Sequence, residues 1–284
     1  MPLHPMEFGV SSMTSPLRTV LVQAPDDAFA RRYASAGDEA FRTAARSQHA
    51  GLVRCLEGLG VAVLQLDDDG GRYDSVYTYD PALVTRRGAV LLRAGKPDRR
   101  GEEDVMARWF EAQGVPIVGR IDDPGTVDGG DVFWLDADTV CIGRSLRTND
   151  EGIRQLSALL DEDVAVFDLP YDAGPAHCLH LLSVISPIAD DLAVIEAARL
   201  PAGLWQLLAS RDIRTVPVAP AEIDALACNV LTVRPGVVVM LDGAPRTQEA
   251  LEAAGVEIHT FEGSVIGVAG GGGPTCLTRP VLRR

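Results

Sequence analysis

Short apolar runs that are typical of buried strands recur five times along the chain. They begin 54, 49, 49 and 43 residues apart. Most of them follow a stretch in which apolar residues recur with the period of an α-helix. The strand-like runs are residues 61–64, 115–118, 164–167, 213–216 and 256–259, and the helical stretches are residues 44–59, 102–112, 151–160 and 247–254. Gly60, Gly114 and Gly255 follow three of these stretches, where a helix C-terminal cap is expected.

Pairs of apolar runs separated by turn residues precede the later helices and predict β-hairpins. The pairs are residues 82–84 with 89–92, 132–135 with 139–142, 181–185 with 192–195, and 229–233 with 237–241. Each unit therefore reads strand, strand, helix, strand. A unit of about 50 residues cannot bury its own apolar face, so neighbouring units must pack together, and five of them predict a closed ring.

The first unit is expected to combine residues 19–24 with the helix that follows them. No linker or low-complexity tract divides the chain. We therefore predict a flexible segment at residues 1–15 and a single α/β domain over residues 16–284. The alternative α/β architecture is a doubly wound sheet, which the frequent hairpins disfavour.

Composition and charge narrow the classes of function. Apolar residues make up 46% and charged residues 23% of the 284 positions, as in ordinary globular proteins. The formal net charge of −14 disfavours binding to nucleic acid or to an anionic membrane, and no run approaches the roughly 18 apolar residues of a membrane span. The five cysteines are widely spaced and the N-terminus lacks the pattern of a secretory signal, so we expect reduced thiols in a cytoplasmic protein.

The first candidate for chemistry is Cys276, which lies shortly after four consecutive glycines near the C-terminus. A thiol on such an approachable backbone suits a nucleophile that a substrate must reach. From this segment alone, a glycine-rich tail with an incidental thiol is an equally good interpretation.

Two further motifs carry carboxylates, imidazoles and a second thiol. Asp128 and Asp131 flank a glycine pair before a strand, where a tight turn is the alternative interpretation. His177, Cys178 and His180 lie within four residues of one another and raise the alternative of a zinc site. No partner ligands appear at a recognisable spacing, which disfavours zinc. One histidine serves better as the acid–base partner that a cysteine nucleophile needs.

Three charged residues are candidates for substrate binding. Asp80 lies in an apolar and aromatic run, and a buried aspartate needs a cationic partner. Arg99 and Arg147 follow the second strands of their predicted hairpins. A solvated surface side chain is the alternative interpretation for each arginine.

The five units and the order of these motifs resemble the guanidino-group-modifying superfamily. The motifs are Asp-Gly-Gly-Asp-Val at 128–132, Arg-Thr-Asn at 147–149, His-Leu-Leu-Ser at 180–183 and the glycine-rich cysteine segment at 270–280. The superfamily includes dimethylarginine dimethylaminohydrolase, arginine deiminase and the amidinotransferases, and the resemblance spans roughly residues 17–280. It implies a five-bladed α/β-propeller, the pentein fold, and a small cationic guanidino substrate, with no metal or organic cofactor.

The resemblance implies catalytic roles for three residues. Cys276 matches the nucleophile, His180 matches the acid–base residue, and Asp128 matches the carboxylate that holds the guanidinium. In that chemistry the thiolate attacks the guanidinium carbon and forms a covalent thiouronium. The histidine protonates the departing amine and then activates water.

The resemblance also implies substrate-binding roles. Asp80 matches the aspartate that closes a short acidic segment of the family. Arg99 and Arg147 match arginines that grip the α-carboxylate of the substrate. Asp131 belongs to the same motif as Asp128, and we assign it a structural role.

The chain departs from the family pattern at two further positions that we assign to substrate binding. Leu182 stands where arginine deiminases and amidinotransferases carry an aspartate for the unsubstituted guanidinium. If it faces the pocket, it favours an alkylated guanidine. Tyr79 stands where the dimethylarginine hydrolases carry a glutamate, which weakens the assignment of methylated arginine specifically.

The leading hypothesis is thus a cofactor-free amidine hydrolase that acts on arginine or an N-substituted arginine and releases citrulline and an amine. An arginine deiminase or an amidinotransferase of the same superfamily is the nearest alternative. A non-enzymatic binding protein on a related five-fold ring ranks third, because a binding scaffold has no need of a thiol, a histidine, carboxylates and arginines together. Assembly into a homo-oligomer stays open.

Overall fold

The computed structural model describes residues 6–35, 38–67, 71–175, 177 and 179–284. The strands in this part of the chain are β1 (Leu17–Val22), β2 (Ala62–Gln65), β3 (Ala82–Val84), β4 (Ala89–Leu91), β5 (Ile117–Arg120), β6 (Val132–Trp134), β7 (Thr139–Arg144), β8 (Asp163–Asp168), β9 (Ile185–Ala189), β10 (Leu192–Ile195), β11 (Arg214–Pro217), β12 (Leu231–Arg234), β13 (Val237–Leu241), β14 (Glu257–Phe261) and β15 (Arg279–Arg283). The α-helices are α1 (Asp27–Tyr33), α2 (Glu39–Gly58), α3 (Glu102–Ala112), α4 (Asp150–Leu159), α5 (Leu181–Val184), α6 (Ala202–Ser210) and α7 (Pro245–Ala253). Shorter turns include the 3₁₀ turns η1 (Pro97–Arg99), η2 (Gly129–Asp131) and η3 (Pro220–Glu222), and the π-helical turn η4 (Ser264–Ala269).

The strands form five mixed sheets of three strands each. We number them sheet I (β15–β1–β2), sheet II (β3–β4–β5), sheet III (β6–β7–β8), sheet IV (β9–β10–β11) and sheet V (β12–β13–β14). In every sheet the middle strand pairs antiparallel with one neighbour and parallel with the other. A parallel pair needs a crossover, and α2, α3, α4, α6 and α7 supply it in sheets I to V. In sheets II to V this order confirms the predicted strand–strand–helix–strand unit.

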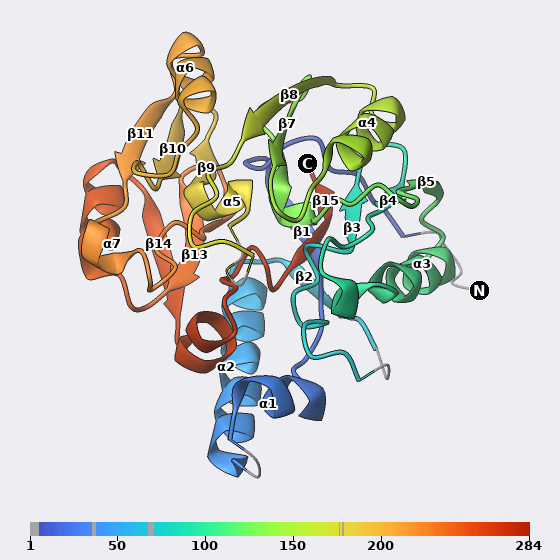
Figure 1. The fold of residues 1–284 in the computed structure, drawn as a ribbon. Coiled ribbons are helices and arrows are strands. Elements are labelled where there is room, and N and C mark those ends of the chain that lie inside the picture. Colours follow the sequence, from blue (N-terminus) through green and yellow to red (C-terminus); the bar gives the residue numbers. More distant parts are fainter. Residues whose placement is uncertain (1–5, 36–37, 68–70, 176, 178) are drawn as a thin grey trace.

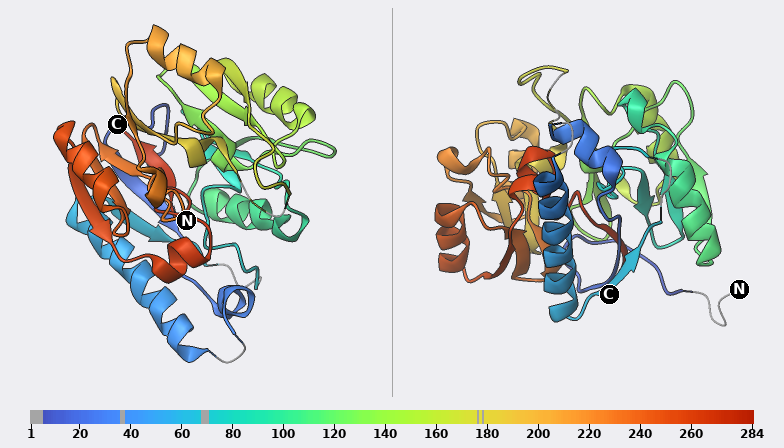
Figure 2. Two further views of the ribbon diagram at one scale, coloured as in Figure 1. Left: turned by 60° about the vertical axis from the view of Figure 1, so that its left-hand side comes forward. Right: turned by 90° about the horizontal axis from the view of Figure 1, so that it is seen from below.

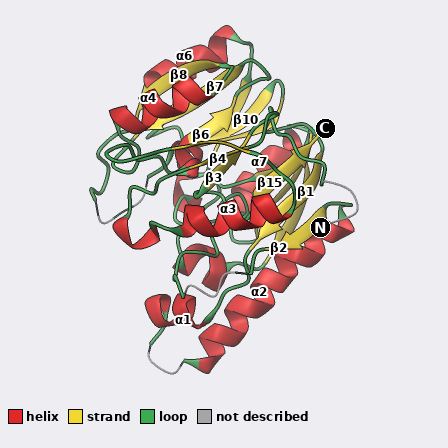
Figure 3. Cartoon of the chain, turned by 90° about the vertical axis from the view of Figure 1, so that its right-hand side faces the viewer, coloured by secondary structure: helices red, strands yellow, loops and turns green. Residues whose placement is uncertain are grey.

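The crossover helices lie around the periphery, and the sheets lie inside them (Figure 1). The cartoon coloured by secondary structure shows the same separation from another side (Figure 3). The arrangement fits the predicted ring of five units. The buried side chains that fill the interior include Trp134, Tyr79, Phe133 and Phe110. Among the residues that the structure describes, no helix combines the length and apolar composition needed to cross a bilayer.

Sheet I is assembled from both ends of the chain, which the sequence pattern did not predict. β15 pairs antiparallel with β1, so the C-terminal segment takes the place that a hairpin partner takes in the other sheets. Pro280 and two arginines interrupt the apolar pattern of β15. β15 is an edge strand, where a proline is tolerated. The two arginines, Arg279 and Arg283, are buried.

Part of the N-terminal segment that we expected to be flexible is packed instead. Residues 1–5 lie outside the described part of the chain. The backbone of Gly9 exchanges hydrogen bonds with Val281 and Arg283 of β15. Val10 and Met13 are buried. The segment is therefore held by the edge of sheet I and by apolar burial.

The predicted strand over residues 181–185 is wrong. Leu181–Val184 form the single helical turn α5, and β9 begins only at Ile185. Two hydrogen bonds explain this local change: the Leu181 N–H donates to Asp131 Oδ1 at 2.9 Å, and the His180 N–H donates to Ser183 Oγ at 3.1 Å. Satisfied backbone donors at a helix start favour the turn over an extended chain.

The helix α6 was missed for a different reason. Its sequence is apolar on most of its surface, so it lacks the helical alternation of buried and exposed positions. Trp205 lies on this helix with 55% of its surface exposed. By contrast, the predicted helix over residues 102–112 matches α3 at both ends. Gly60, Gly114 and Gly255 adopt the positive φ values expected of a C-terminal cap.

Candidate active site

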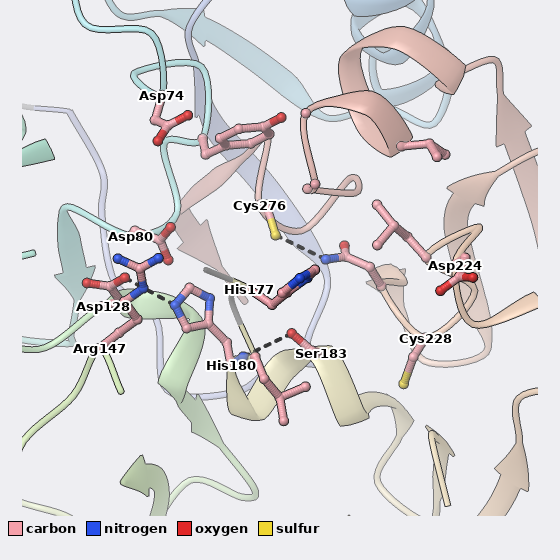
Figure 4. Close-up of a pocket in the computed structure, with 18 of the residues that line it drawn as sticks. Asp74, Asp80, Asp128, Arg147, His177, His180, Ser183, Asp224, Cys228 and Cys276 are labelled. Carbon is pink, nitrogen blue, oxygen red and sulfur yellow. Dashed lines mark hydrogen bonds and ion pairs between the residues drawn. The ribbon is translucent and has the colours of Figure 1, made fainter. Parts of the chain in front are cut away.

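Four candidate residues lie in the loops that lead into the first strand of a sheet or into β15. Asp80 precedes β3, Asp128 precedes β6, His180 precedes β9 and Cys276 precedes β15. All four line one cavity of about 560 Å³. Figure 4 shows the Cys276 sulfur opposite the group formed by Asp80, Asp128 and His180. The fold thus brings together residues that are far apart in the sequence.

His180 and Asp128 form a buried pair. Their Nε2 and Oδ2 atoms are 3.1 Å apart, and the other carboxylate oxygen of Asp128 accepts a hydrogen bond from the Gly95 N–H at 2.8 Å. Burial by itself raises the pKa of Asp128. The hydrogen bond and charge of His180, together with Arg99 and the Gly95 N–H, outweigh burial and hold that pKa below its usual value. Asp128 is therefore ionised and orients the imidazole.

Asp131 lies only three residues from Asp128 but points elsewhere. Its carboxylate accepts hydrogen bonds from the hydroxyls of Ser145 and Thr148, both at 2.6 Å, and from the Leu181 N–H at 2.9 Å. Burial raises the pKa of Asp131 to about 6. Asp131 does not line the cavity. It ties sheet III to the helical turn that carries His180.

Asp80 is held by a buried arginine. Arg99 Nη1 donates to Asp80 Oδ2 at 2.5 Å, and its Nε and Nη2 atoms donate to Glu102 Oε2 at 3.0 and 2.7 Å. Arg99 Nη2 also donates to the Tyr77 carbonyl at 3.0 Å. Burial disfavours the charge on Arg99, but Glu102 and Asp80 raise its pKa well above the usual range. Arg99 lines the cavity, yet in the structure it positions Asp80 and has few donors left for a substrate carboxylate.

Arg147 is placed differently. It lines the same cavity with a partly exposed side chain, and among the described residues its guanidinium has no ion-pair partner. The chain approaches Gly95 so closely here that a Cβ on Gly95 would lie 2.3 Å from the Arg147 carbonyl oxygen. The absence of a side chain at residue 95 therefore sets the position of Arg147. A cation in this setting can bind an anionic group of a ligand.

The cysteine lies against a glycine-rich backbone for steric reasons. A Cβ on Gly272 would lie 2.6 Å from the Tyr77 ring and 3.0 Å from Cys276 Cβ, and a Cβ on Gly273 would lie 2.7 Å from Asn229. Cys276 is half-buried, and Asn229 Nδ2 donates a hydrogen bond to its sulfur at 3.0 Å. The glycines thus allow the thiol segment to pack closely at the cavity.

Tyr79 and Leu182 do not line the cavity, so the prediction that they contact the substrate needs correction. The Tyr79 side chain is buried, and the Arg279 guanidinium lies over its ring at 3.7 Å. Leu182 is buried on α5 and packs in the core of sheets II to IV. Successive side chains of a loop or a helical turn point in different directions, so neither residue follows its catalytic neighbour into the cavity.

Sequence reasoning missed several residues that line the cavity. Asp74 is buried there, where Lys96 Nζ and the Tyr33 hydroxyl each lie 2.5 Å from one of its carboxylate oxygens. Tyr33 belongs to α1, so this helix covers part of the cavity. In sequence, Asp74 lies in a loop with no pattern of its own. Asn229 is another lining residue that was missed.

Among the described residues, the structure supplies no partner ligands for the alternative of a zinc site. His177 is exposed at the cavity, and Cys178 lies outside the described residues. Within the described part of the chain, no group of three or more histidine, cysteine, aspartate or glutamate side chains is arranged to hold a metal ion.

Comparison with known proteins identifies related sequences over nearly the whole chain. Residues 16–283 match the family model described as N,N dimethylarginine dimethylhydrolase, eukaryotic. An N(G),N(G)-dimethylarginine dimethylaminohydrolase from Pseudomonas aeruginosa is 30% identical over 240 residues, which are 82% of this chain and 87% of that protein. A putative arginine deiminase from Mycoplasma pneumoniae is 30% identical over 252 residues, covering 73% of this chain and 61% of that protein.

A solved structure supports the same relationship. The structure of a cysteine-to-serine mutant of the P. aeruginosa dimethylaminohydrolase, in complex with citrulline, superimposes with a TM-score of 0.77 at 25% sequence identity. The match covers 95% of this chain and 100% of the other.

Proposed function

The chain belongs to the N,N-dimethylarginine dimethylhydrolase family, and on that premise we propose that it hydrolyses the guanidino group of an N-methylated arginine. The products are citrulline and a methylamine. The chain is an amidine hydrolase of the pentein superfamily, and we infer that its five sheets form the five blades of an α/β-propeller. The observation that carries the proposal is the convergence of Cys276, the His180–Asp128 pair and Asp80 on one cavity.

The substrate is bound through its charges. The cationic guanidinium lies among the carboxylates of Asp74, Asp80 and Asp128, and Arg147 binds the α-carboxylate at the other end. Asp80 is preorganised by Arg99 and by the Gly130 N–H, which donates to Asp80 Oδ1 at 2.8 Å. Fixing a planar cation between such carboxylates turns its carbon toward the thiol.

In the first half-reaction the Cys276 thiolate attacks the guanidinium carbon. A carbon–sulfur bond forms, and the π electrons move onto nitrogen to give a tetrahedral adduct. His180, protonated and oriented by Asp128, gives its proton to the substituted nitrogen. The carbon–nitrogen bond then breaks, the amine leaves, and a covalent thiouronium remains.

In the second half-reaction the neutral His180 takes a proton from water while the oxygen attacks the thiouronium carbon. The carbon–sulfur bond breaks, and the electron pair returns to sulfur as the thiolate. The proton that remains on the attacking oxygen passes to solvent, where the released amine takes it up, and the ureido product is citrulline. His180 ends the cycle protonated, as it began it. One histidine therefore serves both half-reactions.

The second candidate is an arginine deiminase, which the similarity to the M. pneumoniae protein favours. The chemistry is the same, but ammonia leaves in place of a methylamine. The argument that Leu182 selects an alkylated guanidine does not apply, because Leu182 lies in the core and does not line the cavity. The identity of the leaving amine must therefore be measured.

The test is to incubate the purified protein with arginine, monomethylarginine and asymmetric dimethylarginine, and to quantify citrulline together with the amine released. We expect dimethylamine from asymmetric dimethylarginine and methylamine from monomethylarginine, and no citrulline from the Cys276→Ala variant. Ammonia from arginine as the preferred reaction would favour the deiminase instead. Transfer of the amidino group to an added amine would identify an amidinotransferase.

A further inference from the structure

We propose that Asn229 is a further catalytic residue, whose carboxamide donates a hydrogen bond to the Cys276 sulfur and stabilises its thiolate form. The inference rests on the proposed function in one respect, the role of Cys276 as nucleophile. Asn229 lines the cavity and is 7% exposed, so its amide is shielded from water. Hydrogen bonds to a charged atom are stronger in such a setting.

The orientation of the Asn229 amide is decided by its other partner. The backbone N–H of Thr275, which can only donate, lies 3.0 Å from Asn229 Oδ1. The oxygen must therefore face Thr275, and the NH₂ group must face the sulfur, 3.0 Å from Nδ2. Thr275 directly precedes Cys276. The Asn229 side chain therefore hydrogen-bonds both to the backbone of Thr275 and to the sulfur of Cys276. The dashed line from the Cys276 sulfur in Figure 4 marks this hydrogen bond.

The position of Asn229 in the fold supports the same role. It lies just before β12, the first strand of sheet V. Each of the other sheets places one residue of the proposed site in the corresponding loop: Asp80, Asp128 and His180 before the first strands of sheets II, III and IV, and Cys276 before β15 of sheet I. These five residues follow one another at intervals of 47 to 52 residues. Asn229 is thus the contribution of sheet V to a site to which the other four sheets already contribute.

The chain leaves room for this side chain. A Cβ on Gly273 would lie 2.7 Å from the Asn229 Cγ and Oδ1 atoms. Any side chain at residue 273 would therefore displace the amide from between Thr275 and the sulfur. Gly273 therefore allows the Asn229 carboxamide to reach both partners.

A neutral donor suits the electrostatics of the cavity. Asp74, Asp80 and Asp128 line the opposite part of the cavity, and negative charges disfavour a thiolate nearby. A hydrogen bond from an amide favours the charged sulfur without adding an ion that would repel the cationic substrate. Loss of one such bond to a charged group shifts a pKa by about one unit.

The test measures the alkylation of Cys276 by iodoacetamide as a function of pH, with the modified peptide quantified by mass spectrometry so that the other cysteines do not contribute. Three proteins are compared: the wild type, Asn229→Ala and Asn229→Asp. The aspartate keeps the shape and an acceptor for the Thr275 N–H but has no N–H to donate. We expect the pH midpoint to rise by about one unit in Asn229→Ala, and by at least as much in Asn229→Asp.

The chain contains one other asparagine, which provides a matched control. Asn149 is the N-cap of α4, where its Oδ1 accepts a hydrogen bond from the Gly152 N–H at 2.8 Å. An aspartate serves equally well at an N-cap. Asn149→Asp should therefore fold and keep the wild-type alkylation midpoint.

The expected effect on turnover is also specific. kcat/KM of Asn229→Ala should fall about tenfold near neutral pH, and the deficit should shrink at alkaline pH as the thiol ionises without help. Asn229→Leu, which has nearly the shape of asparagine but no N–H or O–H to donate, serves the same comparison if the alanine variant fails to fold.

The proposal would be overturned by a midpoint for Asn229→Ala that coincides with that of the wild type. A rise confined to Asn229→Asp would then be the effect of an added charge. Failure of the proposed function is distinguishable, because it would appear as no turnover of any guanidino substrate while the alkylation midpoints still shift.

Discussion

The two sides of the cavity are held in place by different forces. The charged side, which comprises Asp80, Arg99 and Asp128 from sheets II and III, is fixed by ion pairs and buried carboxylates. The thiol side, which comprises Asn229 and Cys276, is fixed by close backbone packing and neutral hydrogen bonds. We infer that the charged side supplies the electrostatic hold on a cation, and that the thiol side presents the sulfur without adding charge.

The backbone behind the thiol side is also held by hydrogen bonds to a neutral side chain. Gln48 of α2 accepts hydrogen bonds from the N–H groups of Val265 and Ile266 in η4, at 2.9 and 3.0 Å. The side views show α2 running along this side of the molecule, beside the C-terminal strands and turns (Figure 2). His49, the next residue on α2, is buried, and burial lowers its pKa to about 4. The neutral side chain of Gln48 therefore holds η4, the turn that precedes the nucleophile segment.

The largest expected effect is that of removing the nucleophile. Cys276→Ala should lower kcat/KM by about 10⁴-fold or more, because no covalent intermediate can form. Steady-state kinetics on the substrate with the highest wild-type turnover checks this. The matched control is Cys55→Ala on α2, outside the cavity, which should keep most of the activity. Activity retained in Cys276→Ala would remove the thiol side from the mechanism altogether.

The burial of His49 on α2 predicts a sensitivity of the fold to acid. The pKa of His49 is about 4 in the folded protein and about 6.5 when exposed. The unfolded state therefore binds a proton that the folded state rejects, and stability is lost as pH falls from 6.5 towards 4. The loss from this residue is about 3 kcal/mol.

Urea unfolding at pH 7 and pH 4 measures this loss. His49→Leu should reduce the difference between the two pH values, whereas the control His177→Leu, at an exposed position, should leave it unchanged. An identical acid dependence in wild type and His49→Leu would mean that His49 can be protonated in the folded state.

The charged side should respond to the loss of one carboxylate charge. Asp128→Asn should lower kcat/KM by about 10²-fold, because His180 loses the anion that orients and stabilises its protonated form. The alkaline limb of the pH–rate profile should also move to lower pH, because His180 must be protonated at the start of the cycle and an imidazolium without its anionic partner has a lower pKa. Asp163→Asn, at an exposed position on β8, is the matched control. An unshifted alkaline limb would argue against the pairing seen in the structure.

The smallest expected effect tests close packing on the thiol side. Gly272→Ala should lower kcat/KM about tenfold and the stability by about 1–3 kcal/mol, because its Cβ would meet the Tyr77 ring and Cys276 Cβ. Gly243→Ala is the control, since its Cβ would lie at an ordinary 3.6 Å from Ala225. Thermal unfolding together with kinetics separates the two effects. Equal behaviour of the two variants would show that the glycine run is not sterically required.

Much of the fold could be predicted from local patterns. The hairpins and the helix α3 lie close to where paired apolar runs and helical period placed them, because the hairpin strands are buried along most of their length and one face of the helix is buried. β15 could not be predicted, since its buried arginines and Pro280 are compatible with a strand only when both chain ends meet in sheet I. The turn α5 likewise depends on Asp131, about 50 residues away in the chain.

The candidate site, like the fold, could be predicted only in part from the sequence. The residue types at 128, 180 and 276 and their order were sufficient to predict a guanidino-modifying site, and the comparisons confirm the family. The sequence did not distinguish Arg147, whose charge is uncommitted, from Arg99, whose donors are used within the protein. Asn229 went unnoticed because a lone asparagine before a strand has no signature of its own.

The sequence by itself determined the repeating unit, the chemical inventory and the family. Those properties follow from the periodicity of apolar positions and from residue type. Both can be read from a short stretch of the chain without knowing what it packs against. Only the tertiary structure decided which side chain of each loop enters the cavity. Asp128 and Asp131 show why: three residues apart in one turn, one carboxylate meets His180 and the other meets Ser145, Thr148 and Leu181. Such partners come from other sheets or strands, so the direction of a loop side chain is settled by packing between segments that are distant in the sequence.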